Sequence, residues 1–481
     1  MAEATPAGSG AAPVPIPSVD GMLRIRGGVG GLSFQFEELL AGASALDGIV
    51  RELAAVDEEA EAVRRALFPY QHDSYTSGSH AITAVGEAAR DVRLVRMELE
   101  RLGGAIRASH REYEFAEARN NLILRIGRTG PAYGPLWGLF GLPPVTLRDT
   151  VEDEVALAPA RLALLLGLPA GQAGAGGPGG PGGVRDAVRG LADAPGLEFL
   201  RPRPVRIVGK ETWSEEADVS PAGLLLRAEA VGRNSGDIEV LELEESGSRA
   251  WVVIIPGTQL DGLPQGTNPF DAGGIAEGLG YDSAETAGAI RRALAEAGAE
   301  AGDQIAAVGY SQGGIHAMNL GRDKAFLAEY ELKFVLTAGS PVGGIEAAAG
   351  TGSLHLEHEA DWVPGADGQP NPDTKDRVTV TLASPIPGPE WLEPGLGPGH
   401  AMGRYADGAR DIAASRDPSL QASTAALAAV VGAGGTAKVT RFSLRREAMP
   451  PGRGLRPEAT YLGIDPSDRP REESSPRGIR R

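Results

Sequence analysis

DQIAAVGYSQGGIHAMNL, residues 303–320, is the part of the sequence that says most about the fold. Its apolar run IAAV predicts a buried strand, and the residues that follow have the spacing of a helix. Between them lies GYSQG, residues 309–313, a GxSxG sequence in the strand–turn–helix context of a nucleophile elbow. The serine of such an elbow, here Ser311, has a strained backbone, and a side chain at Gly309 or Gly313 would collide with neighbouring backbone. The stretch therefore predicts a nucleophilic serine, against the alternative of a turn that only binds a ligand.

Short apolar runs of β character alternate with helical stretches on both sides of this elbow. They are PVRIVG, DIEVLELE, WVVIIPG, DQIAAVG, KFVLTAG, SLHLEHE and RVTVTL. Strands that alternate with helices are typical of a mostly parallel sheet covered on both faces. We therefore expect an α/β domain, an α/β-hydrolase by its elbow, over residues 201–449. Residues 450–481 are rich in Arg, Pro, Glu and Ser and are predicted to be a disordered tail.

A serine hydroxyl becomes a nucleophile when a base accepts its proton, and the base needs an acid to orient it. In a hydrolase of this architecture the chain order is serine, acid, histidine. The histidines after Ser311 are His316, His355, His358 and His400. The first belongs to the helix that begins at the elbow and is predicted to be a surface histidine or a hydrogen-bonded helix histidine. The next two lie in an expected strand before the acid and are predicted to be structural. His400, in the loop GLGPGHAMGRY, is the predicted base.

The predicted acid is Asp361, because HLEHEAD is a β run that ends in an aspartate. An acidic residue at the carboxyl end of a strand can reach the same edge of the sheet as the elbow. Asp367 and Asp373 are the alternatives, and their Gly and Pro neighbours are typical of turns.

The oxyanion of an acyl transfer needs two backbone N–H donors. One is expected from Gln312, the residue after the nucleophile, and the other from the loop after an earlier strand. The run WVVIIPGTQLDG supplies that strand and loop, with Gly257, Thr258 and Gln259 as candidates. We favour Thr258.

The N-terminal third has a different pattern. Residues 1–30 are predicted to be disordered, and apolar residues then recur every three or four positions in two runs, separated by the polar stretch FPYQHDSYTSGSH. This spacing predicts two long antiparallel helices over residues 31–130. A mixed connector, residues 131–200, contains the linker GQAGAGGPGGPGG at 171–183.

This hairpin resembles the small helical modules of the WXG and related families, which leave actinobacterial cells by type VII secretion. Tyr113 and Glu117, in YEFAE, match the Tyr-x-x-x-Asp/Glu pattern of such substrates, whereas the turn carries Ser77 and Gly78 in place of Trp-x-Gly. The resemblance implies a secreted or cell-envelope protein with a helical partner or secretion machinery as its partner. The alternative is a purely structural hairpin in a cytoplasmic protein, since Tyr and Glu at this spacing are ordinary neighbours on a helix.

The second part resembles known serine hydrolases. GYSQGG is similar to the elbow of cutinases and cutinase-like actinobacterial hydrolases, while FVLTAGSPVGG, HEADWVPGADG and GHAMGRY resemble the series of motifs in class 3 lipases. The resemblance covers roughly residues 250–410 and implies Ser311, Asp361 and His400 as nucleophile, acid and base. Two departures, the absence of cysteines for cutinase disulfides and of a clear hydrophobic lid, argue against triglyceride hydrolysis.

Composition restricts the partners. The 46 basic and 64 acidic residues give a formal net charge of −18, which argues against nucleic acid or an anionic membrane as the main partner. The absence of cysteine excludes a thiolate metal site and a cysteine nucleophile. No secretory signal and no run long enough to span a bilayer is expected.

The sequence thus predicts a serine esterase that acts on a small-molecule or lipid ester without metal or organic cofactor. An amidase, peptidase or acyltransferase uses the same triad and is one alternative. The other is a secretion-linked or partner-binding protein whose hydrolase domain is inert or accessory.

Overall fold

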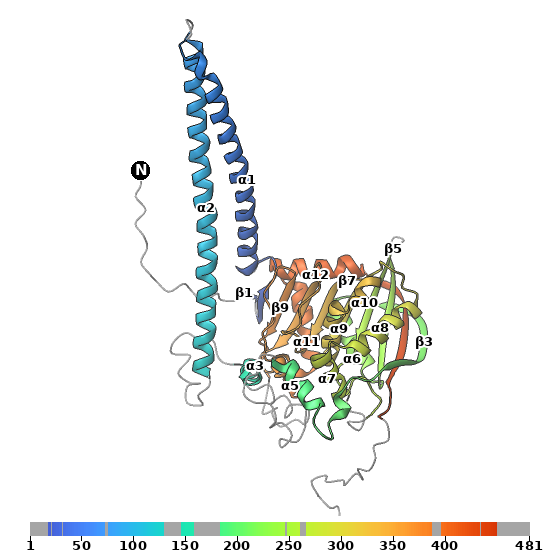
Figure 1. The fold of residues 1–481 in the computed structure, drawn as a ribbon. Helices are drawn as coiled ribbons and strands as arrows, with labels where there is room; N and C mark the ends of the chain where they lie inside the picture. Colours follow the sequence, from blue (N-terminus) through green and yellow to red (C-terminus); the bar gives the residue numbers. More distant parts are fainter. Residues whose placement is uncertain are drawn as a thin grey trace, which may run out of the picture.

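The strand expected before Ser311 lies near the middle of a ten-stranded sheet formed by the described part of the chain (Figure 1). This computed structural model describes residues 18–20, 22–30, 32–72, 76–128, 146–157, 183–245, 248–259, 266–386, 396–432 and 434–449. Helices cover both faces of the sheet. The expected α/β class is therefore confirmed, and the described chain includes the expected pair of long helices in its N-terminal part.

The five strands β5 to β9 pair in parallel, and the flanking pairs are antiparallel. The order across the sheet is β1-β2-β9-β8-β7-β6-β5-β4-β10-β3. The strand bounds are β1 Ser18–Asp20, β2 Leu23–Gly27, β3 Val205–Ala217, β4 Asp237–Glu245, β5 Ser248–Ile255, β6 Gln304–Tyr310, β7 Glu331–Ala338, β8 Gly352–His358, β9 Arg377–Leu382 and β10 Gly435–Arg446. Because parallel strands all end at one edge, the residues after β5, β6 and β8 meet there.

The helices belong to two layers and one projecting hairpin. Their bounds are α1 Leu32–Leu67, α2 Ser77–Arg128, α3 Leu147–Leu157, α5 Gly183–Ala192, α6 Pro221–Val231, α7 Ala272–Tyr281, α8 Ala284–Ala297, α9 Gln312–Asn319, α10 Lys324–Glu329, α11 Met402–Ala414 and α12 Pro418–Val431. Short 3₁₀ turns are η1 Phe68–Tyr70, η5 Glu198–Leu200, η6 Leu320–Arg322, η7 Val363–Asp367 and η9 Pro398–His400.

Each central strand contributes to two cores. In β6, Ala306 and Val308 pack with α6, α11 and α12 on one face of the sheet, while Ile305 and Ala307 pack with α8, α9 and α10 on the other. Burial on both faces explains why the central strands are continuous apolar runs rather than alternating ones. Both cores lie directly behind the elbow and hold β6 in place.

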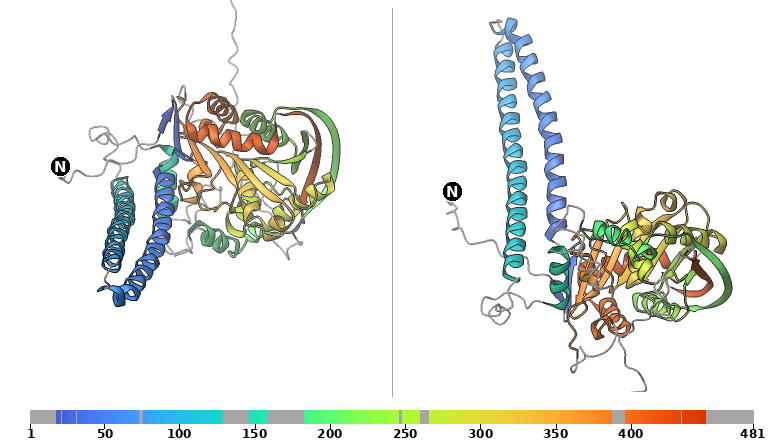
Figure 2. Two further views of the ribbon diagram at one scale, coloured as in Figure 1. Left: turned by 90° about the horizontal axis from the view of Figure 1, so that it is seen from above. Right: turned by 60° about the horizontal axis from the view of Figure 1, so that its bottom comes forward.

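The hairpin of α1 and α2 projects from the sheet edge that carries β1 and β2, and both views in Figure 2 show its helices side by side. Its two helices are joined by ion pairs from Arg93 to Asp57, at 3.1 Å, and to Glu61, at 3.2 Å. The hairpin lies in the chain between β2, which pairs with β9, and α3, which packs against η7. It is therefore an insertion into the α/β body rather than a module that precedes it.

Several predicted boundaries differ from the structure. All seven expected strands are present, but residues 1–30, expected to be disordered, contain β1 and β2, and β10 was not expected. The connector 131–200 contains α3, α5 and η5, whose apolar residues join one core cluster with Ala276 and Ala366. The tail 450–481 and all of the linker 171–183 except Gly183 lie outside the described residues.

Among the residues that the structure describes, no helix combines the length and the apolar character that a membrane crossing requires.

Candidate active site

Ser311 occupies the sharp turn between β6 and α9. Its backbone angles are φ 53° and ψ −121°, one of three positive φ values at non-glycine residues in the described chain. A side chain in this region strains the backbone, and such strain persists only where the surroundings enforce it. The Ser311 N–H donates to Ala338 O of β7 at 2.8 Å, and both neighbouring strands are buried. The turn is therefore held rigidly at the edge of the sheet.

Glycines allow this turn to pack closely. A Cβ atom at Gly309 would overlap the backbone of Gly313, and one at Gly313 would lie 2.5 Å from Pro256 O, with Ile255 O still nearer. The steric reason predicted for both glycines is thus confirmed. Gly314 is equally constrained, because a Cβ atom there would lie 2.6 Å from the Cβ of Ser340.

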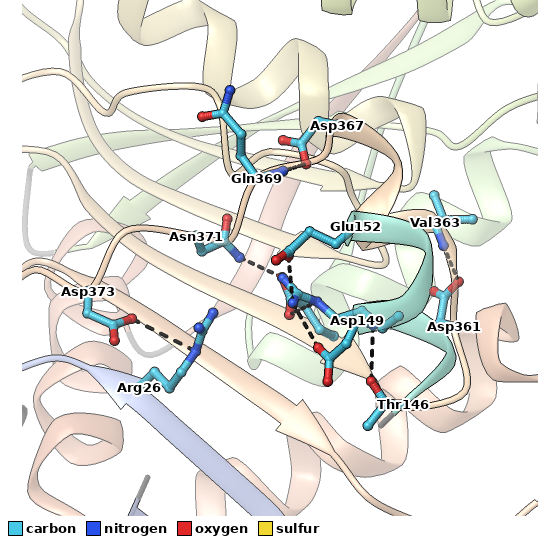
Figure 3. A network of polar contacts seen from close by, with 12 residues as sticks. Arg26, Thr146, Asp149, Glu152, Asp361, Val363, Asp367, Gln369, Asn371 and Asp373 are labelled. Atoms are coloured by element: carbon cyan, nitrogen blue, oxygen red, sulfur yellow. Dashed lines mark hydrogen bonds and ion pairs between the residues drawn. The ribbon is translucent and has the colours of Figure 1, made fainter. Parts of the chain in front are cut away.

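Asp361 and His400 form a buried pair. Asp361 follows β8, and its Oδ2 lies 2.7 Å from His400 Nδ1. Its Oδ1 accepts a hydrogen bond from the Val363 N–H at 2.9 Å, which fixes the plane of the carboxylate (Figure 3). When Nδ1–H donates to the carboxylate, Nε2 becomes the acceptor nitrogen that a general base needs. His400 Nε2 is buried and has no hydrogen-bond partner among the described residues.

Tyr310, which the sequence analysis did not single out, connects the pair to the elbow. Its ring stacks on the imidazole of His400, with centroids 5.0 Å apart and planes at 25°. Its hydroxyl donates to the backbone carbonyl of the same histidine. Since Tyr310 is the residue before Ser311, the strand that carries the candidate nucleophile also holds the candidate base. Gly257 lies next to both residues, because a Cβ atom there would be 2.8 Å from Tyr310 Cδ1 and 3.3 Å from Ser311 Cβ.

Tyr405, on α11, contacts the acid. Its hydroxyl donates to Asp361 Oδ2 at 2.5 Å, so the oxygen that accepts from His400 also accepts from a phenol. Burial first, and then the charge of Asp361, raise the pKa of Tyr405 well above its usual value. The hydroxyl therefore stays protonated and donates over the whole working pH range. Its position in GHAMGRY, near the predicted base, was the only available sequence signal.

The geometry of the site lowers the number of candidate oxyanion donors. Gln259 is committed elsewhere, because its N–H donates to Phe270 O at 2.8 Å and its side-chain oxygen accepts from Gly236 N, also at 2.8 Å. Gln312 is the first residue of α9, where backbone N–H groups have no partner within the helix. Thr258 is half-buried in the loop beside Ser311, and residues 260–265 of that loop lie outside the described chain.

The alternative acids serve the fold. Asp367 accepts hydrogen bonds from the N–H groups of Gly344, at 2.9 Å, and Gln369, at 3.3 Å, and burial raises its pKa to about 6. Asp373 pairs with Arg26 of β2 at 3.9 Å. Asp361 alone of the three contacts His400 through a hydrogen bond that the structure records.

The other histidines downstream are buried and partnered, as predicted. His316 Nδ1 lies 2.8 Å from Ser283 Oγ, and burial lowers its pKa to about 3. His355 Nδ1 lies 2.8 Å from the hydroxyl of Thr337, and His358 Nε2 lies 3.0 Å from that of Ser384.

Two further predictions concern the export motif and metal binding. Tyr113 and Glu117 lie within α2, but their side chains are outside the described residues, so the export motif stays a prediction. In the described part of the chain no group of His, Asp and Glu side chains could hold a metal ion.

Comparisons of the chain with protein-family models, with curated proteins and with solved structures found no match. The function is therefore inferred from the geometry of the site.

Proposed function

We propose that this chain is a serine hydrolase of the α/β-hydrolase type that cleaves carboxylic esters. One observation carries the proposal: Ser311 sits in a strained turn at the start of α9, and the adjacent Tyr310 ring stacks on a histidine that is paired with a buried aspartate. A turn that only bound a ligand would need neither the buried Asp361–His400 pair nor its acceptor nitrogen Nε2.

The proposed reaction uses groups of this chain alone. Ser311 Oγ attacks the ester carbonyl while His400 Nε2 takes its proton, and Asp361 stabilises the imidazolium. The N–H groups of Gln312 and Thr258 bind the oxyanion, and His400 then returns the proton to the leaving alcohol. Water, activated by the same histidine, hydrolyses the acyl-enzyme and restores the serine.

Removal of the nucleophile tests the proposal. Ser311→Ala should lower kcat on nitrophenyl esters of short and medium acyl chains by about 10³-fold or more, because only binding and oxyanion contributions remain. A fluorophosphonate should label the wild type and not this variant. Ser214→Ala, at an exposed position of β3, is the matched control and should retain full activity and labelling. Ester hydrolysis that survives Ser311→Ala would remove the assignment, and an amide panel run in parallel separates esterase from amidase activity.

A second function is favoured by the surface of the hairpin. We propose that α1 and α2 form a docking face for another copy of this hairpin. Ile49, Val56 and Val63 lie seven residues apart on α1 and are 44%, 49% and 45% exposed. Val95 and Leu102 are spaced in the same way on α2 and are 52% and 43% exposed. Such spacing is typical of helices that pack against further helices.

The ion pairs of the hairpin fix how these two stripes are related. The register set by Asp57–Arg93 and by Asp47–Arg107 puts Val56 opposite Val95. A helix rotates about 100° per residue, so both stripes face the same side of the hairpin, away from Arg93 and Asp47. Neither stripe contains a charge. Exposed acidic residues flank both stripes, among them Glu59 on α1 and Glu98 on α2, so a dimer must form against the repulsion of these charges.

Sedimentation of the full chain tests this docking face. We expect a concentration-dependent dimer that Val56→Glu abolishes, because the substitution buries an unpaired charge. Ala62→Glu, an exposed position of α1 on the opposite side, should leave the dimer intact. A wild-type chain that stays monomeric throughout the micromolar range, or a dimer that survives Val56→Glu, contradicts the proposal.

A further inference from the structure

A helix outside the expected hydrolase domain is packed into the loop that carries the candidate acid. The α3 backbone contacts η7 so closely that a Cβ atom at Gly365 would lie 2.8 Å from Glu152 N, and one at Gly368 would lie 2.8 Å from Ala156 N. The Arg148 N–H also donates to Glu359 O at 3.3 Å, two residues before Asp361. These contacts leave no space between α3 and the acid loop, residues 359–368.

Arg148 anchors α3 through its side chain, which is 5% exposed. Its Nε lies 3.0 Å from Glu357 Oε2, at the end of β8, and its Nη1 lies 2.6 Å from Glu152 Oε2 and 3.2 Å from Asp149 Oδ1 (Figure 3). One guanidinium thus pairs with three carboxylates. Although burial lowers it, the pKa of Arg148 is raised overall by these carboxylates, so the group is always charged.

The same cluster reaches the strand next to β8. Asn371 donates to Glu357 Oε1 at 2.7 Å and accepts from Arg377 Nη2 at 2.8 Å. Arg377 begins β9, and its guanidinium also donates to the carbonyls of Val342 and Ile345. Glu357 is therefore held from two sides, four residues before Asp361.

We infer that α3 is part of the catalytic site and that Arg148 is a positioning residue for Asp361. The inference rests on the proposed serine hydrolase function. Val363, whose N–H orients Asp361, is the first residue of η7. Ala366 of η7 packs in one apolar cluster with Val155 of α3. Loss of the Arg148 anchor releases η7, which turns the carboxylate away from His400 Nδ1. The imidazole is then no longer held in the tautomer that accepts the proton of Ser311.

The full chain is tested with Arg148→Met, with Arg148→Lys as the conservative variant and with Arg227→Met as the matched control. Arg227, on α6, pairs at 2.6 Å with the buried Glu239, far along the chain from the acid loop. In the Met variant at position 148 we expect kcat to fall about 10- to 100-fold with little change in KM, because small displacements of a catalytic group have effects of this size. Arg148→Lys should restore part of kcat, and Arg227→Met should leave it unchanged.

Because Arg148→Met leaves the buried Glu357 and the half-buried Asp149 and Glu152 without this cation, the variant can also lose stability. The triple variant Arg148→Met, Glu152→Gln, Glu357→Gln neutralises the two more buried carboxylates and should fold while kcat stays low. Circular dichroism and thermal unfolding monitor the fold, and all assays are run well below the transition. Full kcat in a folded Arg148→Met protein, or in the triple variant, overturns the inference.

A spectroscopic readout separates this inference from the proposed function. The proton between His400 Nδ1 and Asp361 should give a low-field NMR resonance, assigned by its loss in Asp361→Asn. It should disappear or shift in Arg148→Met and persist in Arg227→Met, whether or not the ester panel contains a substrate. An unchanged resonance in Arg148→Met refutes the positioning role, whereas an inactive wild type with the expected resonance changes refutes only the esterase proposal.

Discussion

Two tyrosine hydroxyls hold the candidate base and acid from behind. Tyr310 fixes the backbone of His400 through its carbonyl and the imidazole through stacking, and Tyr405 donates to the carboxylate oxygen that faces Nδ1. A donor on that oxygen draws negative charge away from the histidine. The two contacts therefore act differently: Tyr310 sets where the imidazole lies, and Tyr405 moderates how strongly Asp361 attracts the imidazolium.

Tyr405→Phe separates these effects. Loss of the hydroxyl leaves more charge on Asp361 Oδ2 to stabilise protonated His400, so the acid limb of the kcat/KM profile should move to higher pH. We expect a loss of kcat of about threefold to tenfold at neutral pH. The profile is measured on a nitrophenyl ester, and Tyr330→Phe, a buried tyrosine beside Phe326, is the control. An unshifted acid limb with reduced kcat would show that the hydroxyl only supports packing.

Among single residues, the candidate nucleophile and the candidate base could be predicted, because the motif and the order of the triad along the chain restrict the choice. Ser311 is marked by its glycines, and His400 is the histidine downstream that remains after those in expected regular elements are set aside. Tyr405 and Arg148 could not be selected, because their roles arise from contacts with Asp361 and Glu357 across many residues of chain. Apart from the position of Tyr405 in GHAMGRY, near the predicted base, nothing local distinguishes these two among the described tyrosines and arginines.

The shape of the elbow depends on glycines, which have no side chain. In Gly313→Ala the new methyl group would lie 2.5 Å from Pro256 O and nearer still to Ile255 O, so α9 or β5 must shift. We expect a loss of about 1–3 kcal/mol in the free energy of unfolding and at least a tenfold loss of kcat. Gly190→Ala in α5, where nothing lies within 4 Å, should instead stabilise by about 0.5–1 kcal/mol. Urea unfolding and the ester assay measure both, and a neutral Gly313→Ala would contradict the packing argument.

Elements with strong local patterns could be predicted, and those that depend on distant partners could not. The buried runs of β5 to β7 are continuous and apolar, β8 and β9 alternate apolar with polar residues, and the hairpin helices have clear periodicity. β2 has five residues and is stabilised by pairing with β9, some 350 residues away in the chain. β10 places Ala437 and Val439 in one core and Phe442 and Leu444 in the other, so its apolar residues do not follow a single alternation along the strand. The docking of α3 onto η7 has no local signal.

In the whole molecule, the elements that precede and follow the hairpin in the chain both pack against the α/β body. β2 pairs with β9 before the hairpin, and α3 packs on the acid loop after it. The ends of the hairpin are therefore both attached close to the candidate site. This arrangement makes the acid loop sensitive to charges that the N-terminal segment contributes, above all those of Glu152.

Glu152 makes the stability of the folded protein depend on pH. Burial, and next to it the charges of Glu357 and Asp149, raise its pKa from 4.5 to about 7, against the opposing effect of Arg148. Between pH 4.5 and about pH 7, Glu152 is protonated in the folded chain and ionised in the unfolded chain. The free energy of unfolding therefore falls as pH rises through this window, by up to about 1.4 kcal/mol per pH unit.

Glu152→Gln removes this dependence, because glutamine resembles the protonated acid at every pH. The Tm of the variant minus that of the wild type should thus be more positive at pH 8 than at pH 5. Asp367, whose pKa burial raises to about 6, acts in the same direction in both proteins and cancels in the comparison. Glu58→Gln, at an exposed position of α1, should show no such trend. A Tm difference for Glu152→Gln that is constant between pH 5 and 8 would mean that Glu152 is ionised in the folded chain throughout.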